Sequence, residues 1–173
     1  MGHQDELVVI LNKEGEVVGS KPRKELNKRT DIHHTVFVQL ITPDKKLVMA
    51  QIPQREDLPN LYPYRWGTTM ATIVRVDESA LGAATRGLKR ELHFQRATPE
   101  LLGEKMLQLP DGVHIKATCY RMTSEVPRLF SEKDIAELRT RSLEQVRDLV
   151  DNHPAMLTPT FIELWTNHLH EAV

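Results

Sequence analysis

The sequence predicts a mixed α/β domain, in the broad α+β sense, in which a β-sheet lies between helices and an N-terminal hairpin extends it. Runs of β-branched residues, such as residues 35–42, indicate strands. The apolar residues of the segment 77–94 recur at helical spacing, which indicates a helix. Strands are expected on both sides of that helix, which is typical of a layered domain. With 173 residues, 40% hydrophobic and 27% charged, the chain is expected to form a single domain over residues 1–173.

The first half of the chain is expected to consist mainly of strands joined by turns. A hairpin over about residues 5–20 follows from the run ELVVILN, a turn at Gly15 and a second strand that begins at Val17. The polar stretch 20–31 predicts a loop with a helical turn, and the proline-rich stretch 53–64 predicts a loop. Further strands are expected over 35–42, 47–52 and 69–76.

The second half is expected to carry the helices. Asp77 or Ser79 is placed to cap the helix within 77–94, and its core face is expected to hold Leu81, Ala84, Leu88 and Leu92. Residues 96–112 predict connecting structure. The remaining elements are expected as a strand over 113–125, a short strand near 137–139, a helix capped by Ser142 and a C-terminal helix over about 159–171.

Bulk composition excludes several functional classes. The formal net charge of −1 gives no field that favours a nucleic acid or a membrane surface as partner. No run of 18 apolar residues indicates a membrane-spanning helix, and the charged start of the chain is unlike a signal peptide. Cys119 is the single cysteine, so no internal disulfide is expected and a cytoplasmic location is predicted.

The helix within 77–94 also carries a charge pattern that resembles the Nudix box. Glu78, Arg86 and Glu91 match three charged positions of the box, and Leu88 matches an aliphatic one. The resemblance is incomplete over 72–94, which we describe as a degenerate box. Residues that differ from the pattern are Thr72 and His93 at the two glycine positions, and Gly87 and Arg90 at two acidic positions.

Other segments extend the resemblance to residues 5–168, in particular to the branch of the Nudix superfamily that includes isopentenyl diphosphate isomerase. The hairpin, the strand pair with its Trp-containing loop and the final segment MLTPTFIELW are similar to that branch. The resemblance implies a Nudix-type mixed sheet between helices. It does not imply isomerase activity, because Ala71 falls near the cysteine position, Ile73 near a histidine ligand and Asn27 at another histidine.

In Nudix proteins, acids at the positions equivalent to 87, 90 and 91 share one helical face and bind Mg²⁺ or Mn²⁺, which grips a diphosphate. Here that face offers Gly87, Arg90 and Glu91. The resemblance therefore implies that metal binding is weakened or absent. It assigns Glu91 and Glu78 as catalytic residues and weak metal ligands, and Arg86 as the residue that orients the helix acids. Glu78 is alternatively a structural partner of Arg86.

Four residues are candidates for substrate binding, namely Arg86, Arg90, Trp66 and His34. Three of these four have a plainer interpretation. Arg90 lies on a solvated helix face, Trp66 fills the core under the sheet, and one of His33 and His34 is buried while the other is exposed. The basic run 21–29 either steers a phosphate-bearing ligand or forms a solvated loop.

Two main functions follow. The first is a divergent Nudix hydrolase that acts on a diphosphate-containing small molecule such as a nucleoside diphosphate derivative, with weakened or altered activity. The second is an inactive Nudix-fold module that binds a phosphorylated small molecule. A third possibility is acid–base chemistry without the usual metal set, for which the density of His and Arg near the site is the sole support.

Overall fold

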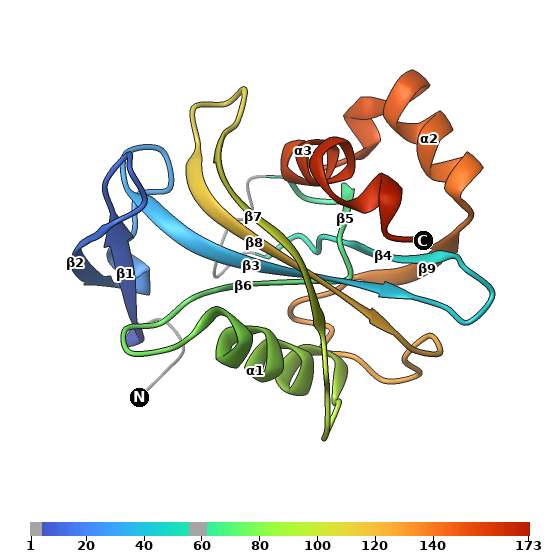
Figure 1. The fold of residues 1–173 in the computed structure, drawn as a ribbon, viewed down its shortest axis with the longest axis horizontal. Coiled ribbons are helices and arrows are strands. Elements are labelled where there is room, and N and C mark those ends of the chain that lie inside the picture. Colours follow the sequence, from blue (N-terminus) through green and yellow to red (C-terminus); the bar gives the residue numbers. More distant parts are fainter. Residues whose placement is uncertain (1–4, 56–61) are drawn as a thin grey trace.

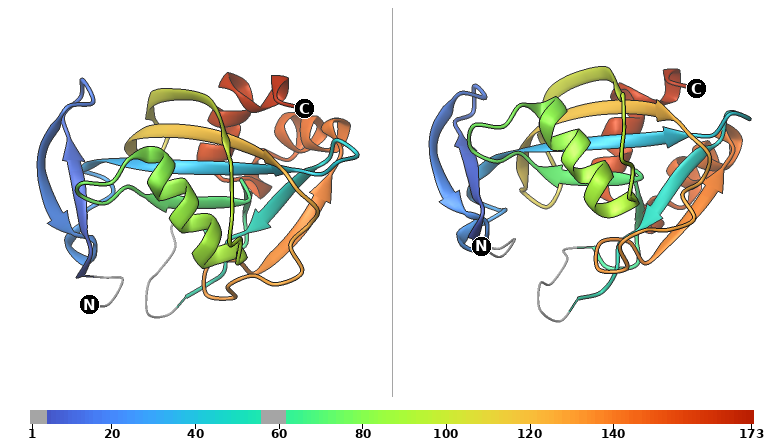
Figure 2. Two further views of the ribbon diagram at one scale, coloured as in Figure 1. Left: turned by 60° about the horizontal axis from the view of Figure 1, so that its bottom comes forward. Right: turned by 90° about the horizontal axis from the view of Figure 1, so that it is seen from below.

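The computed structural model describes residues 5–55 and 62–173, which form one nine-stranded mixed sheet. Helix α1 (Ala80–Leu92) lies on one face of this sheet, and α2 (Leu143–Asn152) and α3 (Pro159–Asn167) lie on the other (Figures 1 and 2). The predicted fold class is therefore confirmed. Residues 1–4 of the expected domain and 56–61 of the expected proline-rich loop lie outside the described residues.

The strands are numbered in chain order, and short 3₁₀ turns lie between the second and third strands, between α2 and α3, and after α3. The strands are β1 (Leu7–Leu11), β2 (Val17–Pro22), β3 (Ile32–Ile41), β4 (Leu47–Gln51), β5 (Trp66–Gly67), β6 (Met70–Ile73), β7 (Glu100–Gln108), β8 (His114–Thr123) and β9 (Glu137–Arg141). The 3₁₀ turns are η2 (Arg23–Glu25), η3 (Pro154–Met156) and η4 (Leu169–Glu171). None of the described helices has both the length and the apolar character needed to cross a membrane.

Local signals located the helix caps well. The Ser79 side chain accepts a hydrogen bond from the Gly82 amide and begins α1. Ser142 and Gln145 form a reciprocal capping box at the start of α2, and Thr158 caps α3. These caps satisfy backbone amides that have no partner within the helix, which is why they mark helix starts in sequence.

Two expectations were wrong. Residues 96–112 are not simply connecting structure, because β7 pairs with β8 along nearly its whole length. Most of β7 is polar and partly exposed, so its sequence shows no run of buried residues, and the pairing partner determines the strand. Leu81 does not face the core but is 50% exposed, since it lies in the first turn of α1 beyond the edge of the sheet contact.

The sheet is built around β3. One edge of β3 pairs in parallel with β8, and its other edge pairs first with β6, over Thr35–Val38, and then with β4, over Leu40–Ile41. The neighbouring strand thus changes at Gln39. Because β6 and β4 share β3 but separate from each other, they leave a fork, and this fork positions the candidate site.

Buried polar groups hold the fork together at its base. The Thr69 hydroxyl accepts a hydrogen bond from the Leu40 amide at 2.8 Å and donates one to the Val48 carbonyl at 2.5 Å. The side-chain Nε2 of Gln39 also donates to the Val48 carbonyl, at 2.8 Å. Gln39 and Thr69 are both 0% exposed, so these bonds replace ladder contacts that the diverging strands cannot make.

We expect Thr69→Val to lower the free energy of unfolding by about 1–3 kcal/mol, because it leaves the buried Leu40 amide without its acceptor. Urea unfolding measures this change. The matched control is Thr166→Val, because the Thr166 hydroxyl bonds to a helix carbonyl on the exposed surface of α3. Equal effects of the two substitutions would show that the fork does not depend on the Thr69 hydroxyl.

Two apolar clusters fill the layers on either side of the sheet. The first joins α2, α3 and η4 to residues of β3, β4 and β8 that include Phe37 and Met49. The second joins α1 to the opposite side chains of β3, including Val36 and Val38. Successive residues of β3 therefore enter different cores, as strand alternation requires.

Candidate functional site

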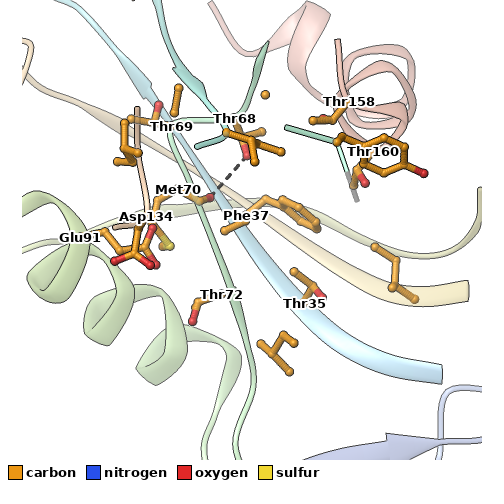
Figure 3. Close-up of a pocket in the computed structure, with 18 of the residues that line it drawn as sticks. Thr35, Phe37, Thr68, Thr69, Met70, Thr72, Glu91, Asp134, Thr158 and Thr160 are labelled. Atoms are coloured by element: carbon orange, nitrogen blue, oxygen red, sulfur yellow. Dashed lines mark hydrogen bonds between the residues drawn. The ribbon is translucent and has the colours of Figure 1, made fainter. Parts of the chain in front are cut away.

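A cavity of about 270 Å³ lies in the fork between β6 and the β4–β5 pair. Figure 3 shows Thr35 and Phe37 of β3 beside it, with Glu91 of α1 and Asp134 on one side. Thr158 and Thr160, at the start of α3, lie on the other side in the same view. The cavity thus extends around β6 from the α1 layer to the α3 layer.

Basic residues converge on this cavity from separate parts of the chain. Arg23 and Lys28 come from the segment after the N-terminal hairpin, Arg90 from α1, and Arg55 and Lys133 from two loops. Against these five basic residues, the described lining contains two acidic ones, Glu91 and Asp134. The excess of positive charge predicts an anionic ligand.

The pKa values of Arg23 and Lys28 indicate that their charges lie near other cations and are partly removed from water. Burial lowers the pKa of the Arg23 guanidinium, and the neighbouring charge of Arg90 lowers it further. Lys28 is exposed as a whole residue, but desolvation of its ammonium group and then the charge of Arg23 lower its pKa. Bringing like charges together in a cavity costs free energy, which an anion bound between them would offset.

Glu91 is the buried acid of the site. Its residue is 4% exposed, and burial raises the pKa of its carboxyl to about 7, although the Arg90 charge opposes that rise. Arg90 Nη2 donates a hydrogen bond to Glu91 Oε1. The acid and the cation next to it in sequence are therefore an ion pair at the cavity wall.

Asp134 is brought beside Glu91 by a short turn. The Ser131 amide donates to the Glu91 carbonyl at 2.7 Å, and the Ser131 hydroxyl donates to Asp134 Oδ2 at 2.7 Å. This turn ties the segment before β9 to the end of α1. The negative charge of Asp134 also contributes to the raised pKa of Glu91. No local sequence signal marks Asp134 as a site residue.

Glu78 and Arg86 form a clamp that does not line the cavity. Arg86 Nε donates to Glu78 Oε1 at 2.7 Å, and Arg86 Nη2 donates to Glu78 Oε2 at 2.9 Å. The guanidinium also donates to Thr72 Oγ1 at 3.2 Å and to the Ile73 carbonyl at 2.9 Å. The bonds to Thr72 and Ile73 fasten α1 to β6, and the two bonds to Glu78 hold the turn that leads into the helix. Both residues therefore position α1 in this structure.

His34 and Trp66 also lie away from the cavity lining. His34 Nε2 is 2.7 Å from Thr118 Oγ1 of β8, on the face of the sheet opposite to that of His33. Burial lowers the pKa of His34 to about 4. Trp66 is 6% exposed within the core beside α3, with Arg139 and Arg141 over its ring at 5.2 and 6.0 Å. The neighbouring His33 is the histidine that lines the cavity, and burial lowers its pKa to about 4.

The donor set does not fit the resident Mg²⁺ or Mn²⁺ that the Nudix box implies. Position 87 has no donor, and a Cβ there would lie 2.5 Å from Met70 Sδ, so an acid at this position would require the Met70 side chain to move. Position 90 supplies a cation that pairs with Glu91. Within residues 5–55 and 62–173, no three His, Cys, Asp or Glu side chains are grouped to hold a metal ion.

Sequence reasoning thus found two of the residues that the structure brings together, Glu91 and Arg90, and missed others. The basic run 21–29 was a signal for Arg23 and Lys28, but such a run more often forms a solvated loop, which was the favoured interpretation. Strand alternation separates His33 from His34, and the sequence does not show which of them faces a cavity.

Comparisons with known proteins point to one fold family, although no family model matches the chain. The uncharacterized Nudix hydrolase PA4841 of Pseudomonas aeruginosa is 26% identical over 149 residues, covering 83% of this chain and 85% of that protein. An isopentenyl-diphosphate Delta-isomerase of Aliivibrio fischeri is 22% identical over 178 residues, covering 96% of this chain and 98% of that protein.

A solved structure agrees with these sequence relatives. DR0079 from Deinococcus radiodurans superposes with a TM-score of 0.77 at 18% identity, covering 92% of this chain and 96% of that one. At this identity the superposition establishes the fold alone, whereas PA4841 is a relative that is itself described as a Nudix hydrolase. The sheet between helices, the helix that carries Arg86 and Glu91 with Glu78 just before its start, and these comparisons together identify the chain as a protein of the Nudix fold.

Proposed function

We propose that this protein binds a diphosphate-containing small molecule, of the nucleoside diphosphate type, in the fork cavity without a resident metal ion. The observation that carries the proposal is the convergence of Arg23, Lys28 and Arg90 on one cavity. Guanidinium groups suit this task because they bind phosphate oxygens in a bidentate manner. In this arrangement Arg90 takes the place of the cation that the Nudix box would otherwise hold.

The cavity also has room for the rest of such a ligand. Its volume is about 270 Å³. We call the part lined by Arg23, Lys28, Arg90, Glu91 and Asp134 the charged wall, and beyond it the lining includes Phe37, Ile115 and Thr160. Ligand sites usually combine apolar walls with a few polar groups that fix orientation. The clamp of Glu78 and Arg86 supports this site indirectly, by holding α1 and therefore Arg90 and Glu91 against β6.

Calorimetric titration with ADP, UDP and inorganic diphosphate in the presence of EDTA tests the proposal. We expect binding without metal, and a loss of roughly tenfold or more in affinity for Arg23→Ala and for Arg90→Ala. Lys24→Ala is the matched control, since Lys24 is exposed, pairs with Asp5 and lies one residue from Arg23. Absence of binding in EDTA, or an Arg23→Ala variant that binds like the Lys24→Ala control, contradicts the proposal.

Hydrolysis of the bound diphosphate is a second candidate function. The observation that favours it is that the carboxyl groups of Glu91 and Asp134 lie beside each other at the cavity wall (Figure 3). A carboxyl with a pKa of about 7 exchanges protons near neutral pH, as a general acid or base must. Incubation of nucleoside diphosphates and their derivatives with the protein and Mn²⁺ tests this candidate. No turnover, or turnover that Glu91→Gln changes no more than Glu132→Gln does, rules it out.

A further inference from the structure

The free edge of β6 borders the candidate cavity. In the described part of the chain, β6 pairs with β3 on one edge and with no strand on the other. The Val74 amide donates to the His34 carbonyl, which sets the alternation of the ladder. Antiparallel pairing then directs the amides and carbonyls of Met70 and Thr72 toward β3, and those of Ala71 and Ile73 away from it.

A second hydrogen bond agrees with this assignment. The Ile73 carbonyl accepts a hydrogen bond from Arg86 Nη2 at 2.9 Å, so the outward edge of β6 is within reach of side chains that are not part of the sheet. Ala71 is the next outward residue along the same edge. It is exposed, whereas Met70, Thr72 and Ile73 are buried, and all four residues line the cavity.

Ala71 also lies between the two parts of the cavity. The adjacent residues of β6, Met70 and Thr72, face Gly87 of α1 and therefore the charged wall. Ala71 itself pairs in register with Phe37, which belongs to the apolar part. A ligand whose phosphates lie among the cations therefore extends past the Ala71 backbone before it reaches Phe37.

We propose that the amide and carbonyl of Ala71 bind the hydrogen-bonding edge of the ligand's base, so that the base adds to β6 in the way a further strand would. The inference rests on the proposed function, and it names the part of the site that reads the uncharged half of the ligand. An extended residue presents a donor and an acceptor on one side. Each nucleobase carries a donor next to an acceptor and matches that pair. The short methyl side chain of Ala71 leaves the backbone accessible.

Ala71→Pro removes the amide hydrogen. Because that hydrogen points away from β3, the substitution breaks no ladder bond, and proline is tolerated at such edge positions. Ala71→Ser keeps the amide and is the matched control. The affinities of both variants and the original protein are measured in EDTA for ADP, GDP, CDP, UDP and inorganic diphosphate, and their folding is checked by thermal unfolding.

In the original protein we expect at least one nucleoside diphosphate to bind roughly tenfold or more tightly than inorganic diphosphate. Ala71→Pro is expected to abolish that advantage and leave the affinity for inorganic diphosphate unchanged, whereas Ala71→Ser retains both. If no nucleoside diphosphate exceeds inorganic diphosphate, or if Ala71→Pro keeps the advantage, the inference is wrong while the proposed phosphate site stands. If inorganic diphosphate and all four nucleotides fail to bind, the proposed function itself has failed.

A second measurement covers an Ala71→Pro variant that does not fold. The original protein is titrated with the tightest-binding nucleotide methylated on its base edge, for example N3-methyl-UDP for UDP or N6,N6-dimethyl-ADP for ADP. Methylation removes the donor of the base, so the advantage over inorganic diphosphate should disappear. Equal affinities for the methylated and unmethylated nucleotides would overturn the inference.

Discussion

Replacing Arg86 with methionine is expected to lower the free energy of unfolding by about 3–5 kcal/mol, as is typical when one partner of a buried ion pair is removed. The Arg86 and Glu78 side chains are each 17% exposed, and the guanidinium makes four hydrogen bonds to Glu78, Thr72 and Ile73. Burial alone would raise the pKa of Glu78, yet hydrogen bonds from Arg86 and the Arg75 amide hold it below its ordinary value. Without Arg86 this carboxylate loses most of what stabilises its charge.

Urea unfolding at neutral pH measures the change, and Lys89→Met is the control. Lys89 lies on the exposed surface of the same helix and carries the same charge, so its replacement should alter stability by no more than about 0.5 kcal/mol. Arg86→Lys is expected to recover little, because an ammonium group cannot reproduce the planar guanidinium geometry. A loss below about 1 kcal/mol for Arg86→Met would show that α1 is held to β6 mainly by apolar packing.

Glu91→Gln is expected to stabilise the protein above pH 7 by about 2–4 kcal/mol, and to have almost no effect near pH 4.5. Burial raises the pKa of the folded carboxyl from 4.5 to about 7. Below the lower value both the folded and unfolded states are protonated, so no difference arises. Between the two pKa values the unfolded chain loses its proton more readily, and each rise of one pH unit costs the folded state about 1.4 kcal/mol. Glutamine has no proton to lose and avoids that cost.

The pH dependence of the unmodified protein combines this effect with opposing ones. Burial lowers the folded pKa of His33 and of His34 from 6.5 to about 4, so those residues add stability as pH rises through that range. The measurement is therefore the difference between Glu91→Gln and the original protein, from pH 4.5 to pH 8. Glu132→Gln, an exposed acid, should give a flat difference. A difference for Glu91→Gln that does not grow with pH would show that Glu91 ionises normally.

Arg86 and Glu91 show which features of the site the sequence predicts and which it does not. The pattern of Glu78, Arg86 and Glu91 predicts one helix of one fold family. That helix forms with Ser79, one of the two expected residues, as its cap, and Glu78 lies just before it. The pattern treats the three residues as one site. In the structure Arg86 turns toward Glu78 and β6, whereas Glu91 turns toward the cavity, because they lie five residues apart and occupy different parts of the helix surface.

The Nudix fold, the helix caps and the incomplete acidic box were determined by the sequence itself, because hydrophobic period, capping residues and the spacing of the box are local properties of the chain. The tertiary structure decided that β7 forms, that His33 rather than His34 faces the cavity, and that Arg23 and Asp134 approach Glu91. Each of these depends on which strand or loop lies beside another. Such contacts join segments that are far apart in the sequence. The local pattern of one segment does not specify which distant segment lies beside it, so these contacts could not be predicted from the sequence.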